Sequence, residues 1–283
     1  MESLSTIGEA PLRLAAFASI FVVMALLELA MPRRVPGEGK KARWFTNLAI
    51  TGIGGLILRA MAMLAVPIAA VAAAAWAQSQ GWGVLSWLDW PGWLKILLAM
   101  IVLDLAIYGQ HVASHKIPLI WRLHKVHHTD VDFDVTTALR FHPVEIALSM
   151  LWKIAVVLAL GASPWAVVLF EVTLNGCAMF NHANIALPLR LDAVVRLFIV
   201  TPDMHRVHHS IHSYEHESNY GFNLSLWDRL FKTYTAQPKD GHLGMTIGQK
   251  NHLNDNPKKL IWSLMLPFMS TKRTSTQKKL KGK

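Results

Sequence analysis

Residues 111–128 read HVASHKIPLIWRLHKVHH and carry two closely spaced histidine clusters, HVASH and HKVHH. A third cluster, HRVHH, occupies residues 205–209 after a long apolar interval. Histidines three and four positions apart lie on one face of a helix, so the spacing predicts that each cluster directs its imidazoles toward a single point. Repeated clusters at this spacing are typical of a metal site, and the packing of a lone buried histidine does not explain them.

The clusters contain eight of the fourteen histidines, and Cys177 is the single cysteine of the chain. Imidazole ligands with one thiol exclude a cysteine-ligated zinc ribbon and an iron–sulfur cluster, and leave iron, zinc, copper or nickel. Eight histidines exceed the number that one ion binds, so the sequence predicts two metal ions. The eight candidate ligands are His111, His115, His124, His127, His128, His205, His208 and His209.

The composition indicates a membrane protein, because 53% of the 283 residues are hydrophobic and 16% are charged, whereas soluble domains carry about 25% charged residues. Long apolar runs occupy residues 14–31, 48–76, 93–109 and 146–180. The first run is about as long as a membrane-spanning helix. It lacks a basic start and a clear cleavage site, so we expect a retained anchor rather than a signal peptide.

Two of these runs are longer than one simple span. Residues 48–76 contain Arg59 and Pro67, which predicts a tilted or kinked helix. Residues 146–180 are interrupted by GASP at 161–164, a turn signal that predicts a membrane hairpin. The hairpin returns the chain to the side it left, so His182 is expected to share that side with the three clusters.

Lysine and arginine flank the clusters, whereas the expected opposite loops, residues 78–92 and 161–164, carry neither. The positive-inside rule therefore predicts a multi-pass integral membrane protein with its histidines on the cytoplasmic face, consistent with a bacterial inner membrane. The net charge of +10 is dispersed beside apolar runs and in a basic tail at 272–283. This distribution favours anionic lipid headgroups over nucleic acid.

Other polar residues are candidates for supporting roles. His182, at the end of the returning helix, and His142, at the start of the hairpin, are expected to be further metal ligands. Asp104 lies on the stripe of His111 and is predicted either to hydrogen-bond a ligand histidine or to pair with a structural partner. Asn175 is a second candidate beside the site, on an inward stripe with Glu171 and Ala178. The histidines predicted to lie at the surface are His212, His216, His242 and His252.

The pattern as a whole resembles the fatty acid hydroxylase/sterol desaturase superfamily. The resemblance covers roughly residues 95–236 and rests on the three clusters together with RFHP at 140–143, HAN at 182–184, NYG at 219–221 and LWDRLF at 226–231. Two positions depart from the family pattern. Lys232 stands where a glycine is common, and Ala178 stands where some members carry a histidine four residues before the one matched by His182.

The resemblance implies a membrane-bound non-haem di-iron oxygenase that hydroxylates or desaturates a lipid. It implies two iron ions, for which zinc can substitute in a purified sample, and molecular oxygen as co-substrate. No flavin or nicotinamide motif occurs in the chain, so an external donor such as a cytochrome b5-like protein or a ferredoxin is expected to supply electrons. The alternative is a histidine-rich membrane metal transporter or metal-binding protein without oxygenase activity.

We therefore predict an all-α fold, a polytopic membrane helical bundle with a cytoplasmic helical cap that carries the dimetal site. Residues 1–92 are expected to form N-terminal transmembrane helices. Residues 93–236 are expected to form the catalytic domain, with its membrane hairpin at 146–180, and residues 237–283 an interfacial segment and basic tail. The lipid, the carbon attacked and the choice between hydroxylation and desaturation stay open at this stage.

Overall fold

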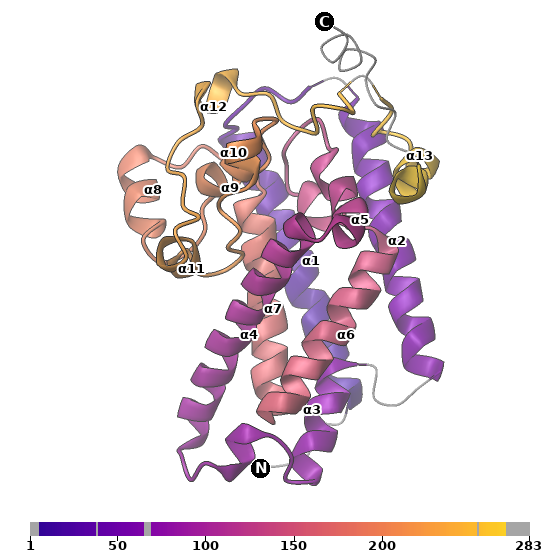
Figure 1. Cartoon of the computed structure of the whole chain (residues 1–283), viewed down its shortest axis with the longest axis vertical. Helices are drawn as coiled ribbons and strands as arrows, with labels where there is room; N and C mark the ends of the chain where they lie inside the picture. The colour runs from indigo at the N-terminus through magenta and orange to yellow at the C-terminus, as the bar shows by residue number, and fades with distance from the viewer. Residues whose placement is uncertain (1–5, 38, 65–68, 254, 270–283) are drawn as a thin grey trace, which may run out of the picture.

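The computed structural model describes residues 6–37, 39–64, 69–253 and 255–269, and its regular structure is helical (Figure 1). Within these residues, β-structure is limited to isolated bridges such as Pro32 with Ile185. The prediction of an all-α membrane bundle with buried histidine clusters is confirmed. The basic tail at 272–283 and Pro67 lie outside the described residues.

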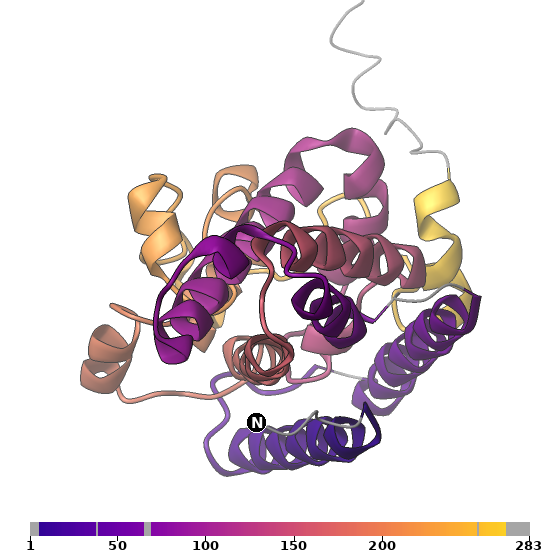
Figure 2. The same cartoon turned by 90° about the horizontal axis from the view of Figure 1, so that it is seen from below.

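Long helices form a bundle below a cap of short helices (Figure 1). α1 packs against α7, α2 against α6, and α4 against both α6 and α7. Seen from below, α1 and α2 form one side of the bundle (Figure 2). The bundle helices are α1 (Thr6–Ala30), α2 (Lys40–Leu64), α3 (Ala70–Ser79), α4 (Gly92–Lys116), α6 (Pro143–Leu160) and α7 (Pro164–Asn181).

Four segments within these helices are long and apolar enough to cross a membrane, which identifies an integral membrane protein. They are Pro11–Ala30, Lys40–Met63, Gly92–Lys116 and Pro143–Leu160. The sequence left the number of spans over residues 48–76 open, and the described residues do not form one continuous tilted or kinked helix. The run is divided between α2, which ends at Leu64, and α3, which begins at Ala70.

The predicted hairpin turn joins α6 to α7. Gly161 ends α6 with φ of 67°, a left-handed conformation that glycine adopts without strain. Ser163 then caps α7 by accepting a hydrogen bond from the backbone N–H of Ala166, and Pro164 occupies the first turn. α7 therefore runs back to the cap (Figure 1), and His182, the C-cap residue of α7, lies at that end.

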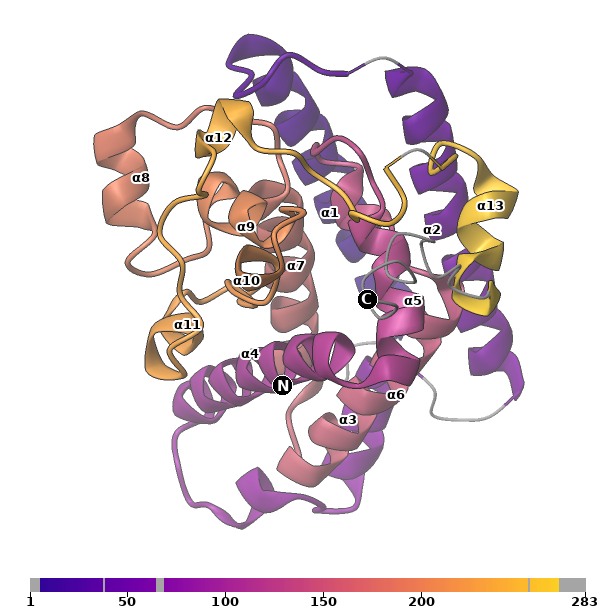
Figure 3. The same ribbon diagram turned by 45° about the horizontal axis from the view of Figure 1, so that its top comes forward.

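The cap surrounds the ends of α4 and α7, with α9 and α10 lying across from α5 (Figure 3). Its main helices are short, so tertiary contacts rather than helix propensity stabilise them. The cap helices are α5 (Pro118–His128), α8 (Leu189–Val195), α9 (Pro202–His208), α10 (Ser213–His216), α11 (Leu226–Leu230), α12 (Gly241–Gly244) and α13 (Leu260–Met265). Short 3-10 turns are η1 (Val84–Trp87), η2 (Thr137–Leu139) and η3 (Leu266–Phe268).

Buried arginines fasten the cap to the bundle. Arg43 of α2 pairs with Asp130, at 2.8 Å between Nη2 and Oδ2, and with Asp134, at 2.9 Å. Arg140 donates hydrogen bonds to the carbonyl oxygen of Val126 and to Asn47 Oδ1, each at 2.8 Å. These bonds fix α5 and the segment that follows it, and both arginines are almost fully buried. Removing one partner of such a buried pair costs about 3–5 kcal/mol.

Candidate metal centre

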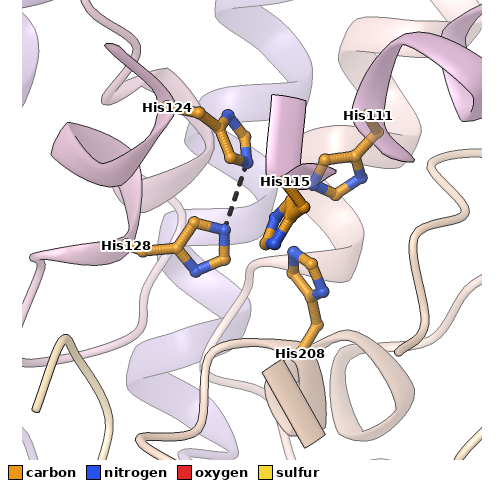
Figure 4. A group of neighbouring side chains, drawn as sticks. All are labelled: His111, His115, His124, His128 and His208. Carbon is orange, nitrogen blue, oxygen red and sulfur yellow. Dashed lines mark hydrogen bonds between the residues drawn. The ribbon is translucent and has the colours of Figure 1, made fainter. Parts of the chain in front are cut away.

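Five buried histidines from three helices form the first group of candidate ligands, here called the five-histidine group. One nitrogen of each imidazole lies within 4.8 Å of the corresponding nitrogens of the other four. α4, α5 and α9 each contribute, so residues almost 100 positions apart in sequence face one point (Figure 4). The members are His111, His115, His124, His128 and His208.

Four further histidines form the second group, here called the four-histidine group, with nitrogens again within 4.8 Å of one another. The Nε2 atom of His182 lies 3.1 Å from that of His127 and 3.2 Å from that of His205. All members are fully buried. They come from α5, the end of α7 and α9, and are His127, His182, His205 and His209.

The two groups are neighbours and share the HxxHH motifs. The rings of His128 and His209 stack across the boundary with centroids 4.5 Å apart. The expectation that each cluster points to a single site is wrong for both HxxHH motifs. Consecutive helical residues are rotated by about 100°, so the paired histidines of HxxHH diverge. In α5, His127 joins the four-histidine group while His128 joins the five-histidine group.

Backbone carbonyls hold several imidazoles in one orientation. The Nδ1–H of His111 donates to the Tyr220 carbonyl oxygen at 2.7 Å, and that of His208 donates to Ser218 at 2.6 Å. His182 donates in the same way to Ala178 at 2.8 Å. A carbonyl oxygen only accepts, so in each case Nδ1 carries the proton and Nε2 keeps a free lone pair. This tautomer leaves Nε2 available for a metal ion.

A buried carboxylate orients one further imidazole. Glu145 Oε1 accepts a hydrogen bond from His124 Nδ1 at 2.6 Å, and only 5% of Glu145 is exposed. A carboxylate on the far side of a ligand imidazole increases the basicity of the ligand nitrogen. Glu145 was not among the predicted site residues. Its signal in the sequence was an acidic residue in the first turn of a mainly apolar helix.

The donor atoms fit metal ions. Burial lowers the pKa of His124 and of His182 to about 3, so both imidazoles are neutral at physiological pH. Within the described residues, ring nitrogens without a partner include His208 Nε2 and both nitrogens of His209. Leaving a buried polar atom unpaired costs about 1–3 kcal/mol, and a bound cation would remove this cost.

The spacing of the nitrogens also fits. Metal–imidazole bonds are about 2.0–2.1 Å long, which puts neighbouring ligand nitrogens roughly 3.0–3.4 Å apart. The Nε2 atoms of His124 and His128 are 3.1 Å apart in the five-histidine group. In the four-histidine group, the Nε2 atoms of His127 and His182 are also 3.1 Å apart. Each group can therefore hold a metal ion through imidazole nitrogens.

His142 lies outside both groups. Its Nδ1 accepts a hydrogen bond from the backbone N–H of Val144, which makes it the N-cap of α6. Its Nε2–H donates to the Leu264 carbonyl oxygen at 3.2 Å. Both ring nitrogens are thus used, and the structure does not support the expectation that His142 is a ligand.

Two histidines expected at the surface are buried. His216 contacts the ring of His115 at 4.7 Å between centroids and belongs to a small group with His115 and Glu217. Its Nδ1–H donates to the His208 carbonyl oxygen at 3.3 Å. His242 is 6% exposed and contacts Gln237 Oε1 at 3.0 Å. The short helix α10 packs on α9 and buries a segment whose polar composition had indicated a loop.

The two expected supporting residues lie in different places. Asp104 Oδ2 accepts hydrogen bonds from Trp227 Nε1 at 2.8 Å and from the Leu224 N–H at 3.2 Å. It therefore pairs with a structural partner and ties α4 to the loop before α11. Asn175 lines the cavity beside the five-histidine group, together with Glu171 and Ala178 as their stripe predicts.

This cavity, about 350 Å³ in volume, extends from the five-histidine group between the bundle helices. His111 and His124 form part of its wall, with Phe141 and Phe222 beside them. Further wall residues come from α1, α2, α6 and α7. A molecule in the cavity would therefore lie in the membrane part of the protein and reach the candidate ligands at one end.

The fold and the site together define a class, the polytopic helical membrane proteins with two adjacent histidine-only sites that can hold metal ions. Residues 96–233 match the family model described as fatty acid hydroxylase. This segment belongs to the fatty acid hydroxylase/sterol desaturase superfamily, as its motifs predicted.

Several curated proteins are similar to the chain. The ornithine lipid hydroxylase OlsE of Rhizobium tropici is 28% identical over 241 residues, which cover 83% of this chain and 70% of OlsE. The alkylglycerol monooxygenase of Homo sapiens is 30% identical over 149 residues, covering 52% of this chain and 32% of that protein. The cholesterol 25-hydroxylase of Rattus norvegicus is 23% identical over 150 residues, 52% of this chain and 49% of that protein. No solved structure matches the chain.

The chain thus spans most of OlsE but about a third of the alkylglycerol monooxygenase. All three relatives are named as hydroxylases or monooxygenases. The prediction of an oxidoreductase is confirmed at this level.

Proposed function

We propose that the protein is a membrane-bound non-haem di-iron oxygenase that hydroxylates a lipid with molecular oxygen and external electrons. The observation that carries this proposal is the pair of adjacent histidine groups, one of which borders a cavity among the membrane helices. Iron bound there would supply the redox chemistry for oxygen activation, which zinc cannot supply. The names of the relatives support lipid hydroxylation.

Different residues of the chain have different roles in the proposed reaction. Imidazole nitrogens of the five-histidine and four-histidine groups hold the two irons. The carbonyls of Tyr220 and Ser218 and the carboxylate of Glu145 keep three of the imidazoles in the binding tautomer. Phe141 and Phe222 narrow the cavity beside His111 and His124, which orients an acyl chain and excludes water from the reacting carbon.

The proposed cellular arrangement follows from the charges on the cap. Lysine and arginine residues such as Arg33, Arg34 and Lys116 lie at the cap end of the bundle, which supports a cytoplasmic cap. A bacterial inner membrane is the proposed location, and OlsE is a bacterial relative. A cytochrome b5-like protein or a ferredoxin would then reach the cap from the cytosol.

We also propose the domain division expected from the sequence. Residues 93–236 contain all nine histidines of the two groups. The N-terminal helices within 1–92 add wall residues to the cavity, among them Phe17 and Thr51. Residues 237–283 include the segment whose Leu264 carbonyl accepts the hydrogen bond from His142.

Metal analysis combined with lipid analysis tests the proposal. The purified protein should bind iron, consume oxygen with a reductant, and add one oxygen atom to a membrane lipid. Loss of two hydrogens from the lipid would instead identify a desaturase. Zinc alone, with no iron uptake and no oxygen consumption, would contradict the oxygenase and favour a metal transporter or metal-binding protein.

A further inference from the structure

A cluster of charged side chains lies within the helical bundle, two of them on candidate membrane-spanning helices. Lys153 of α6 donates to Glu171 Oε1 of α7 at 2.7 Å, and Arg13 of α1 pairs with Glu171 Oε2. The side chains of Lys153 and Glu171 are 11% and 4% exposed, and that of Arg13 is 36% exposed. Ionisable groups in membrane helices are costly, and they commonly mark a site for a ligand or an ion.

All three side chains line the cavity that begins at His111 and His124. Along α6, Lys153 follows Glu145, the hydrogen-bond partner of His124, by eight residues, roughly 12 Å at the helical rise. The cavity therefore has candidate metal ligands at one end and the charged cluster about 12 Å away.

The wall between the two ends is not pure hydrocarbon. Ser149 donates a hydrogen bond to Gln110 Oε1 at 3.3 Å, and both residues line the cavity with Asn175. Phe17 and Leu174 supply apolar wall on the sides. The apolar wall fits a hydrocarbon chain, and the charged cluster favours a polar group at that end of the chain, because buried polar groups require partners.

The charges of the cluster are not balanced among the described side chains, because two cations share the single carboxylate of Glu171. One ion pair would be enough to connect α6 with α7, and a buried pair contributes little net stability. Arg13 therefore adds a positive charge to the Lys153–Glu171 pair at this end of the cavity.

We propose that Lys153 and Arg13, positioned by Glu171, bind an anionic oxygen group, a carboxylate or a phosphate, on the lipid that occupies the cavity. This assignment deepens the proposed oxygenase function and rests on it for the reaction. With about 1.2 Å per bond of an extended chain, the reacting carbon lies roughly ten bonds from the anionic group.

Binding of three probes with the same chain tests the subsite without iron or oxygen. The probes are hexadecanoic acid, hexadecyl phosphate and hexadecan-1-ol, each radiolabelled and measured against the full-length protein in nanodiscs, with empty nanodiscs as background. At least one anionic probe should bind about tenfold more tightly than the alcohol, and the stronger of the two identifies carboxylate or phosphate. Equal binding of all three would overturn the proposal.

Two variants locate the effect. Lys153→Met should reduce the preference for the anion to less than about twofold. Arg13→Gln leaves the Lys153–Glu171 pair intact and should weaken the preference by a smaller factor, which keeps the test open if Lys153→Met does not fold. Lys95→Met removes a cation from α4 outside the cavity lining and should change nothing. An undiminished preference in both cavity variants would contradict the assignment.

Failure of the subsite and failure of the oxygenase are distinguishable. If anions bind preferentially but the iron-loaded protein consumes no oxygen, the subsite stands and the proposed function fails. If lipid is hydroxylated with the same KM for the acid and the alcohol, the function stands and the subsite fails. The position of the new hydroxyl group gives a further check on the expected separation.

Discussion

The five-histidine and four-histidine groups are built from the same two motifs in opposite ways. In α5 the outer histidines of HxxHH, His124 and His128, join the five-histidine group, and the middle one, His127, joins the four-histidine group. In the second motif the outer pair, His205 and His209, joins the four-histidine group. Each motif therefore bridges both sites, and damage to either motif reaches both.

The surroundings of the two groups differ. Only the five-histidine group contributes residues to the cavity wall, through His111 and His124. The four-histidine group lies behind it, with Phe133 packed on His182 at 5.4 Å between ring centroids. The five-histidine group is therefore the substrate-facing site, and the four-histidine group is the inner site. Changes in the surroundings of one group should affect its metal affinity alone, whereas loss of a ligand from either group should abolish turnover.

Removing one ligand from each group should have the largest effect. We expect His128→Ala and His209→Ala each to lower turnover by more than about 100-fold. Changing a residue that only hydrogen-bonds to a metal ligand already costs about 10–100-fold. Metal content per chain, measured by mass spectrometry, should fall in both. His252→Ala, which removes a partner of Asp255 at the surface, is the control. Full activity in either ligand variant would show that its group is not a metal site.

Metal removal should affect both groups together. Chelation should abolish turnover and lower the unfolding temperature, because a ligand at about 1,000 times its Kd stabilises the folded state by about 4 kcal/mol per site. Adding iron should restore stability and turnover, whereas zinc should restore stability alone. Thermal unfolding and oxygen uptake are measured on the same samples. Turnover restored by zinc would contradict a redox role for the metals.

Glu145→Gln should separate the two groups. The amide oxygen can still accept from His124 Nδ1, but the acidic partner of the imidazole is lost, so the metal affinity of the five-histidine group should fall by about 10–100-fold. Release to a chelator should then show one weakened site and one unchanged site. Glu28→Gln is the matched control. Glu28 is also a buried acidic residue, but it accepts hydrogen bonds from the backbone N–H groups of Val135 and Asn184 rather than from a histidine. Equal weakening of both sites would refute the assignment of Glu145 to one group.

His142→Ala should have the smallest effect. Losing the N-cap of α6 should lower stability by about 1 kcal/mol and leave metal content unchanged. Ser163→Ala removes the corresponding cap of α7 and should give a change of similar size. Thermal unfolding and metal analysis of the two variants are compared. A metal ion lost from His142→Ala alone would restore His142 as a ligand.

What the sequence predicted well depends on local spacing. The histidine clusters require helical periodicity, and the hairpin requires Gly161, Ser163 and Pro164 at a helix end followed by a helix start. Both features act within a few residues, so they can be recognised without knowing the fold. His182 was predicted because the hairpin brings α7 back to the cap.

What the sequence missed depends on how helices face one another. The division of His127 and His128 between two groups is set by the packing of α5 against α4 and of α9 against α7. His142 and Glu145 lie three residues apart in the first turn of α6, and the rotation of that turn brings the carboxylate, not the imidazole, to His124. His216 was missed because the packing of α10 on α9 is not visible in its polar sequence.

Mössbauer spectroscopy of the iron-57-loaded protein, with iron counted per chain, tests the central claim that the two histidine groups together hold an iron pair. We expect two irons per chain in two distinguishable histidine-ligated environments, because five imidazoles form one group and four form the other. A single iron per chain, or iron content that is the same in the His128→Ala and His209→Ala variants as in the unaltered protein, would contradict the claim.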